Sequence, residues 1–152
     1  MPHVQPPRQP ATNKMSTVSI RLHHVSLTVA DMNRSIEFYR SLGFVVAHEY
    51  LSADASRRMA HLQLGTVMLE LFQFPLHQSQ EPPSNRDIHP LGLRHFALAV
   101  DSVTDAHAHV VELGFVCDGI ATGLSGLRYF FVRDPDGIWF EVIEDRRGSA
   151  ST

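Results

Sequence analysis

The sequence is poor in cysteine, in long apolar runs and in excess charge of either sign. Its single cysteine, Cys117, excludes an internal disulfide and fits a reducing cytoplasm. No apolar run is long enough to span a bilayer. The 13 Lys and Arg nearly balance the 16 Asp and Glu, and no basic stripe appears, which argues against a nucleic-acid partner. We therefore expect a cytoplasmic globular protein, with an inert packed thiol at Cys117 because its surroundings are apolar.

Two histidine–glutamate pairs stand at one fixed spacing. His24 and Glu70 are 46 positions apart, as are His95 and Glu141, and the second pair follows the first by 71 positions. Both residue types are metal ligands and acid–base groups, so their identical placement suggests one shared site. Glu70 lies in an apolar stretch, where an unpaired charge is costly and a metal ion would offset the cost. Taken singly, each residue has an ordinary alternative as a hydrogen-bonded or exposed strand residue.

The sequence around the two pairs repeats as well. Residues 24–29 align with 95–100, and residues 42–45 align with 113–116 without a gap. A repeat of this length indicates two copies of one supersecondary unit, each too small to bury a core alone. The alternative is two unrelated amphipathic strand–helix stretches, which would leave the fixed offset unexplained.

Each copy predicts the same order of elements. Alternation of polar and apolar residues over 24–29 predicts a half-buried strand, after which Asp31 caps a helix that ends near Gly43. In the second copy a helix follows Ser102 and ends near Gly114. Further strands are expected near 44–50, 58–64 and 67–74, and near 115–118, 126–133 and 138–144. The predicted fold class is α+β, with two βαβββ modules in tandem.

The module boundaries follow from composition. Residues 1–18 hold four prolines and no apolar core of a signal peptide, so we expect a flexible N-terminal extension there. The first module is predicted over 19–74 and the second over 93–145. Between them, residues 75–92 are expected to form a Pro-rich linker, and residues 146–152 a flexible tail.

The strand faces are expected to bring the two pairs together. Each histidine lies on the strand face that points away from the helix, whereas the neighbouring apolar residues lie on the face that packs against it. Each glutamate likewise alternates along its strand with residues that face the helix. Both pairs should then project into one cavity, with open positions for water or substrate. The expected substrate pocket is lined by Ser26, Thr28, His61, Phe72, Phe74, Ala97, Arg128 and Trp139.

Four of the remaining polar residues have weaker interpretations. His61 would support a ligand from the third strand. Arg128 would anchor an anionic group, unless it is an ordinary surface arginine. His107 and His109 are expected at solvated positions of the second helix.

Five motifs carry a resemblance to a known superfamily. They are HVSLTVAD (24–31), EFYRSLGF (37–44), MLEL (68–71), RHFALAV (94–100) and DPDGIWFE (134–141). Over residues 22–145 the chain resembles the vicinal oxygen chelate superfamily, which includes glyoxalase I, methylmalonyl-CoA epimerase, extradiol dioxygenases and bleomycin- and fosfomycin-resistance proteins. It is most similar to small bacterial glyoxalase-like proteins related to lactoylglutathione lyase. The resemblance implies a U-shaped, mostly antiparallel sheet around a divalent metal ion, whose four ligand positions fall on His24, Glu70, His95 and Glu141.

The resemblance also implies a chemistry. The expected function is a metal-dependent lyase or isomerase that chelates a small substrate through vicinal oxygens and stabilises an enediolate. Glu141, or else Glu70, would be the catalytic base, and Zn, Ni, Co, Mn or Fe would suit the four ligands. Glyoxalase I usually has arginine and asparagine, both contacting glutathione, where this chain has Thr28 and Phe74. A glutathione adduct is therefore not the expected substrate.

Two other functions fit the same resemblance. One is an extradiol-type dioxygenase with Fe(II), whose family pattern is two histidines and one carboxylate, so a fourth ligand at Glu70 argues against it. The other is a non-catalytic module that binds a ligand or an antibiotic, as bleomycin-resistance proteins do without the metal ligands. The expected partner is a small molecule with vicinal oxygens. A homodimer is open, because in this superfamily modules pair within one chain or between two.

Overall fold

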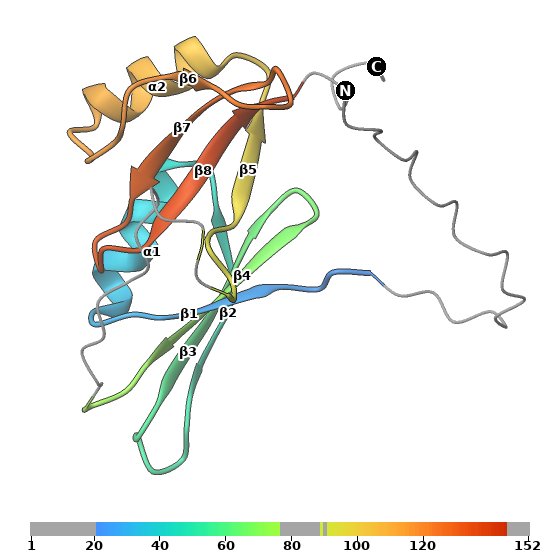
Figure 1. Cartoon of the computed structure of the whole chain (residues 1–152). Coiled ribbons are helices and arrows are strands. Elements are labelled where there is room, and N and C mark those ends of the chain that lie inside the picture. Colours follow the sequence, from blue (N-terminus) through green and yellow to red (C-terminus); the bar gives the residue numbers. More distant parts are fainter. Residues whose placement is uncertain (1–20, 77–88, 90, 146–152) are drawn as a thin grey trace, which may run out of the picture.

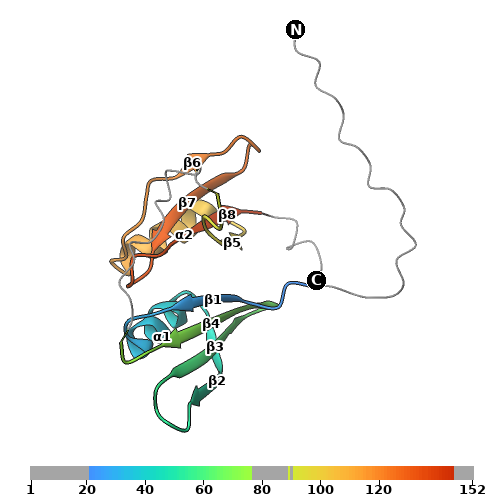
Figure 2. The same ribbon diagram turned by 60° about the horizontal axis from the view of Figure 1, so that its bottom comes forward.

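The computed structural model describes residues 21–76, 89 and 91–145. The extension predicted over 1–18, the middle of the predicted linker and the tail predicted over 146–152 lie outside the described residues. The described chain forms two modules, each a four-stranded sheet with one helix, stacked one above the other in Figures 1 and 2. Among these residues, no helix has the length and apolar character needed to cross a membrane.

Both modules have the element order strand, helix, strand, strand, strand, which confirms the predicted α+β class with tandem βαβββ modules. The first contains β1 (Val25–Thr28), α1 (Met32–Ser41), β2 (Val45–Leu51), β3 (Arg58–Leu64) and β4 (Val67–Gln73). The second contains β5 (Ala97–Val100), α2 (Val103–Glu112), β6 (Ala121–Thr122), β7 (Arg128–Arg133) and β8 (Trp139–Glu144). The first strand of each module pairs in parallel with its last strand, and the other neighbours are antiparallel. The described strands form two sheets, ordered β1-β4-β3-β2 and β5-β8-β7-β6, one for each module.

The helices begin where their capping residues predict. The Asp31 carboxylate accepts the Arg34 N–H at 3.1 Å before α1, and the Ser102 hydroxyl accepts the Asp105 N–H at 3.3 Å before α2. Each bond satisfies one of the N–H groups that a first helical turn leaves without a partner. Gly43 ends the turn after α1 with φ at 96°, a left-handed conformation that suits glycine.

The alternation in β1 separates a helix-covered face from an open face. Leu27 and Val29 are 9% and 1% exposed, whereas Ser26 and Thr28 are exposed. β1 pairs with β4 so that Ser26 stands opposite Glu70. The face that carries Glu70 is therefore the one turned away from the helix, as the period of two predicts.

Helix α1 joins the two modules, because it packs on its own sheet and on the second module. The Phe38 ring lies 4.5 Å from the Phe115 ring and 6.2 Å from the Phe140 ring, measured between centroids. Tyr39 is fully buried and lies 6.3 Å from Phe140. One hydrophobic cluster therefore runs through both modules, with α1 between them.

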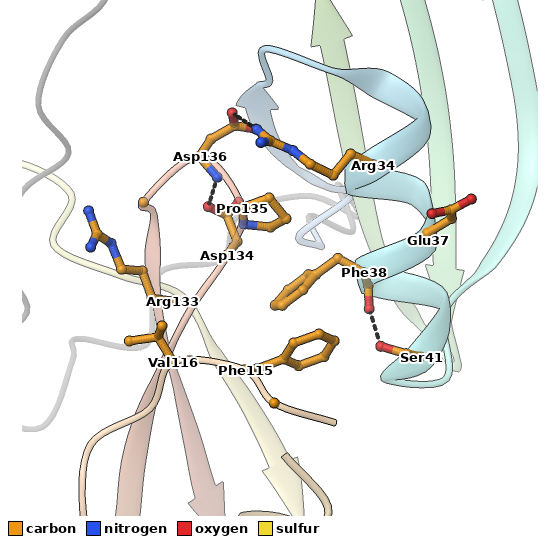
Figure 3. A pocket seen from close by; sticks show the side chains of 12 residues that line it. Arg34, Glu37, Phe38, Ser41, Phe115, Val116, Arg133, Asp134, Pro135 and Asp136 are labelled. Carbon is orange, nitrogen blue, oxygen red and sulfur yellow. Dashed lines mark hydrogen bonds and ion pairs between the residues drawn. The ribbon is translucent and has the colours of Figure 1, made fainter. Parts of the chain in front are cut away.

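Polar bonds fix the same junction. Asp134, only 4% exposed, accepts the Tyr39 hydroxyl at 3.0 Å and the backbone N–H groups of Asp136 and Ile138 at 2.9 and 2.8 Å. Arg34 of α1 forms an ion pair with Asp136 at 2.9 Å, visible in Figure 3. Burial raises the pKa of Asp134, and these three hydrogen bonds lower it without cancelling the effect of burial. Burial and the neighbouring Asp134 carboxylate likewise raise the pKa of Tyr39 well above its usual value.

The strand predicted near 115–118 is wrong, because the regular strand in this region is the short β6 farther on. Cys117 forms one isolated bridge with Val132, and regular pairing resumes only where Ala121 faces Tyr129, one residue out of register. Gly119 lies inside the interruption. A glycine within a strand commonly marks such a bulge, since it has no side chain to pack against its neighbours.

Candidate metal centre and substrate site

The first module places a histidine on each side of Glu70. His24, directly before β1, lies 3.4 Å from Glu70, measured from Nε2 to Oε2. His61 of β3 lies 3.1 Å from the other carboxylate oxygen, Oε1, in a hydrogen bond. The Glu70 side chain is 15% exposed, so it is accessible and yet held by both rings.

The electrostatics of Glu70 favour its ionised form. Partial burial alone would raise the pKa of this carboxyl, but the hydrogen bond from His61, the charge of His24 and the hydrogen bond from Ser26 outweigh it. The net effect lowers the pKa of Glu70 below its usual range. The carboxylate is therefore available as a ligand or a proton acceptor near neutral pH.

The second module repeats the pair with one difference. His95 Nε2 lies 3.4 Å from Glu141 Oε2, at the same separation as in the first module. Phe131 of β7 stands opposite Glu141, where His61 stands opposite Glu70, and its ring lies 5.1 Å from the His95 ring. Glu141 therefore has no counterpart of the His61 hydrogen bond.

The two pairs have the spacing of two ligands on one ion. A separation of 3.4 Å is longer than the usual N–H···O hydrogen bond of about 2.9 to 3.0 Å. Two tetrahedral ligands that each lie about 2.1 Å from a zinc ion stand about 3.4 Å apart. The His24 and His95 side chains are 37% and 28% exposed, so an ion can reach both pairs. The residues present fit a divalent metal.

The two pairs remain separate within the described part of one chain. There, no group of three or more His, Cys, Asp or Glu side chains is arranged to hold a metal ion. Contacts of α1 with Phe115 and Phe140 form the junction between the modules. Each module therefore presents one half of the predicted four-ligand set.

Comparison with protein families agrees with this fold. A family model described as the Glyoxalase/Bleomycin resistance protein/Dioxygenase superfamily matches residues 21–142, which include both pairs. The chain belongs to this superfamily. The superfamily resemblance expected from the five sequence motifs is thereby confirmed.

This chain covers nearly the whole length of two similar proteins. The uncharacterized protein YwkD of Bacillus subtilis (strain 168) is 34% identical over an alignment of 128 residues, and the match covers 81% of this chain and 95% of YwkD. The uncharacterized protein YaeR of Escherichia coli (strain K12) is 32% identical, over 82% of this chain and 95% of YaeR.

Solved structures show the same glyoxalase fold. A glyoxalase family protein from Enterococcus faecalis has a TM-score of 0.71 and 28% identity, covering 82% of this chain and 97% of its own. A glyoxalase I variant from Zea mays has a TM-score of 0.69 at 23% identity, over 81% of this chain and 44% of its own, and shows the fold alone.

The residues predicted for the pocket of this glyoxalase-superfamily protein lie in several places. Ser26 and Thr28 are exposed on β1, and Phe72 follows Glu70 by two positions on the same face of β4. The Phe72 and Phe74 rings stack with centroids 6.2 Å apart. Ala97 stands opposite Glu141, and Trp139 precedes Glu141 by two positions on the same face of β8.

Arg128 lies apart from this pocket. Its guanidinium donates to the Thr104 hydroxyl of α2 at 3.2 Å and approaches Glu144 at 3.8 Å. Those contacts place it on the helix-covered side of the second sheet. The strand period explains this, because Arg128 is three positions from Phe131, which faces Glu141.

One other sequence interpretation changes at α2, and two near it hold. His107, expected to be solvated, packs its ring 4.9 Å from Phe130 and contacts the Asp118 carbonyl at 3.0 Å. Cys117 lies 3.8 Å from His107, and burial followed by the charge of Asp118 raises the pKa of its thiol. A raised pKa keeps the thiol protonated, in agreement with an inert cysteine. His109 is exposed, as expected.

A groove of about 680 Å³ separates α1 from the second module on one side. Figure 3 shows its wall, with the Phe38 and Phe115 rings next to each other and Asp134, Pro135 and Asp136 above them. None of the four candidate ligands lines it. Its lining residues come from α1 and from the second module, so the groove belongs to the module junction. Its Arg34 and Asp136 side chains form an ion pair with each other.

Sequence reasoning missed two residues on the face that carries Glu70. His48 and Tyr50 of β2 stand opposite His61 and Met59 of β3. A signal was present, because His48 and Tyr50 flank Glu49 within a stretch predicted as a strand. The β-bulge between Val46 and His48 hid their face, since one extra residue reverses the alternation.

Proposed function

We propose that this protein is a divalent-metal-dependent enzyme whose site combines His24 and Glu70 with His95 and Glu141. The observation that carries the proposal is the pair separation of 3.4 Å, found twice and matched to the spacing of metal ligands. Zn, Ni, Co, Mn and Fe all accept such a set of nitrogen and oxygen ligands. The bound ion would act as a Lewis acid on the vicinal oxygens of a small substrate.

We further propose that a second copy of the chain completes the site. Each module offers one pair, and α1 occupies the junction between the modules of one chain. A two-fold dimer would place the first pair of one copy against the second pair of its partner, and would form two equal sites. This arrangement uses all four ligands without breaking the α1 junction.

The side chains suggest a division of roles between the two glutamates. Glu70 is held by His24 and His61. Among the described residues, the one polar side chain paired with Glu141 is His95. Glu141 is therefore freer to move a proton at the carbon next to a substrate carbonyl, leaving an enediolate. His61 would fix the orientation of Glu70. The proposed reaction class is a glyoxalase-like lyase or isomerase reaction.

The pocket supports a compact substrate. Phe72, Phe74 and Trp139 add apolar surface, and Thr28 replaces the charged residue usual in glyoxalase I. Such a site favours a small molecule with vicinal oxygens and an apolar portion over a zwitterionic glutathione adduct. We propose a cytoplasmic location, since the free cysteine Cys117 suits a reducing compartment.

Metal content of protein purified without chelator tests the proposed centre. His24→Ala and His95→Ala should each lose stoichiometric metal, while His109→Ala, at an exposed position of α2, should retain it. Circular dichroism should show all three folded. Undiminished metal in His95→Ala would refute the shared centre.

Mixed dimers test where the site forms. Chains with His24→Ala and chains with His95→Ala, refolded together, should regain metal if copies share sites. One site of each mixed dimer then collects both substitutions, and the other keeps all four ligands. No regain of metal would show that each site forms within one chain.

Turnover tests the proposed substrate class. The hemithioacetal of methylglyoxal and glutathione should be converted weakly or not at all with any of the candidate metals. A kcat/KM of about 10⁴ M⁻¹s⁻¹ or more, the ordinary enzyme range, would identify a working glyoxalase I instead.

A further inference from the structure

The open face of the first sheet continues from Glu70 to the edge strand β2. Cross-strand partners share a face, so each register level forms a row across the sheet. One level is polar and runs through Ser26, Glu70, His61 and His48. The next level is mostly apolar and runs through Thr28, Phe72, Met59 and Tyr50.

Three rings gather at the β2 end of this face. The centroids of His48, Tyr50 and His61 lie 6.0, 6.3 and 5.9 Å from one another. His48 is exposed and Tyr50 is 49% exposed. Within the described residues, neither side chain has a hydrogen-bond or ion-pair partner. An N–H group of His48 and the hydroxyl of Tyr50 are therefore free to bind a ligand.

The charges on this face favour an anion at its β2 end. Glu70 is the one acidic residue at the two register levels, and both of its oxygens face histidines. Glu49 alternates to the opposite face, where Arg58 approaches it at 3.5 Å. The Arg57 guanidinium lies 5.9 Å from the centre of the Phe72 ring, on the open face. Among the described residues at these two levels, no carboxylate other than Glu70 is therefore present to compete with a ligand for His48 and Tyr50.

We propose that His48 and Tyr50, with His61 behind them and Arg57 at the rim, bind an oxyanion of the substrate. This inference rests on the proposed function, because Glu70 would stand at the end that holds the vicinal oxygens. Adjacent strands are about 4.8 Å apart, so β2 lies about 10 Å from β4. The substrate class is a small acid whose vicinal oxygens and terminal carboxylate or phosphate are joined by a short chain over Met59 and Phe72.

Histidine ring resonances of the full-length protein test this subsite. Succinate and inorganic phosphate are titrated separately, at constant ionic strength maintained with chloride. We expect saturable shifts of the His48 and His61 rings, and no saturable shift of His109 on α2. The probe with the lower Kd identifies the group as a carboxylate or a phosphate. Equal shifts at His109, or shifts that never saturate with either probe, would overturn the proposal.

Conservative variants separate the subsite from the metal centre. His48→Phe combined with Tyr50→Phe should raise the Kd by about tenfold or more, since two donors are lost. The matched control His109→Phe should leave it unchanged. The His48/Tyr50 variant should retain metal, whereas His95→Ala should lose metal and still bind the probe. Probe binding that disappears in His95→Ala, or survives the His48/Tyr50 variant, would place the anion elsewhere.

Discussion

Replacement of Tyr39 by phenylalanine should expose the energetics of the module junction. The substitution removes the hydroxyl that donates to Asp134 at 3.0 Å and leaves the ring packing in place. Asp134 is 4% exposed, so water cannot replace the lost donor. A hydrogen bond to a charged group contributes about 1.5–3 kcal/mol, and we expect a loss of that size in the free energy of unfolding near neutral pH.

The pH dependence of this loss has a definite sign. The folded pKa of Asp134 is raised, so its contribution to stability is present below the unfolded pKa and is lost as pH rises through the folded pKa. The Tyr39 hydroxyl favours the ionised carboxylate, so Tyr39→Phe raises the pKa of Asp134 further. The cost of the substitution should therefore shrink to about 0.5–1.5 kcal/mol, that of a neutral hydrogen bond, below the ordinary aspartate pKa of about 3.9.

Urea unfolding followed by circular dichroism, at one protein concentration, measures these values. Asp134→Asn supplies the matched background, because its oxygen can keep both backbone N–H groups while its charge is gone. In that background Tyr39→Phe should cost about 0.5–1.5 kcal/mol at every pH. An equal cost in both backgrounds, or a cost under about 0.5 kcal/mol near neutral pH, would refute an ionised Asp134 at the junction.

Three further predictions concern packing, a turn and the thiol. Phe38→Ala should lower the free energy of unfolding by about 3–5 kcal/mol, measured by urea titration, whereas Val111→Ala at an exposed position should change it by less than about 0.5 kcal/mol. Gly137→Ala should cost about 1–2 kcal/mol in the same titration, because φ is 87° there; an unchanged midpoint would contradict the left-handed turn. The Cys117 thiol should react with a disulfide reagent more slowly than free cysteine near neutral pH, and faster reaction would contradict its raised pKa.

Local signals were enough to predict most of the fold. Asp31 and Ser102 marked the helix starts, and the polar–apolar alternation of β1 assigned its two faces, because these rules depend on neighbours in the chain. The second edge strand was misplaced, since the bulge around Gly119 depends on pairing with β7. Register is a long-range property, and a single extra residue changes it.

The candidate site was predicted in its parts and less well in its assembly. The repeat singled out both histidine–glutamate pairs, and the structure brings each pair together. No pattern in one chain predicts whether two modules face each other, because the packing of α1 decides it. The positions of Arg128 and His48 were missed for a related reason, since strand faces must be counted from the observed register.

The two helices hold equivalent places in the two modules, but they differ in how much change each can tolerate. α1 buries Met32, Ser35, Ile36, Phe38 and Tyr39, whereas α2 buries only Val103 and Val110. The two helices of a repeated unit begin with equal packing constraints. Here α1 also packs against the second module, so its sequence is the more constrained. Labels, fusions and accumulated substitutions should therefore be accepted on α2, while α1 should remain close to its present sequence.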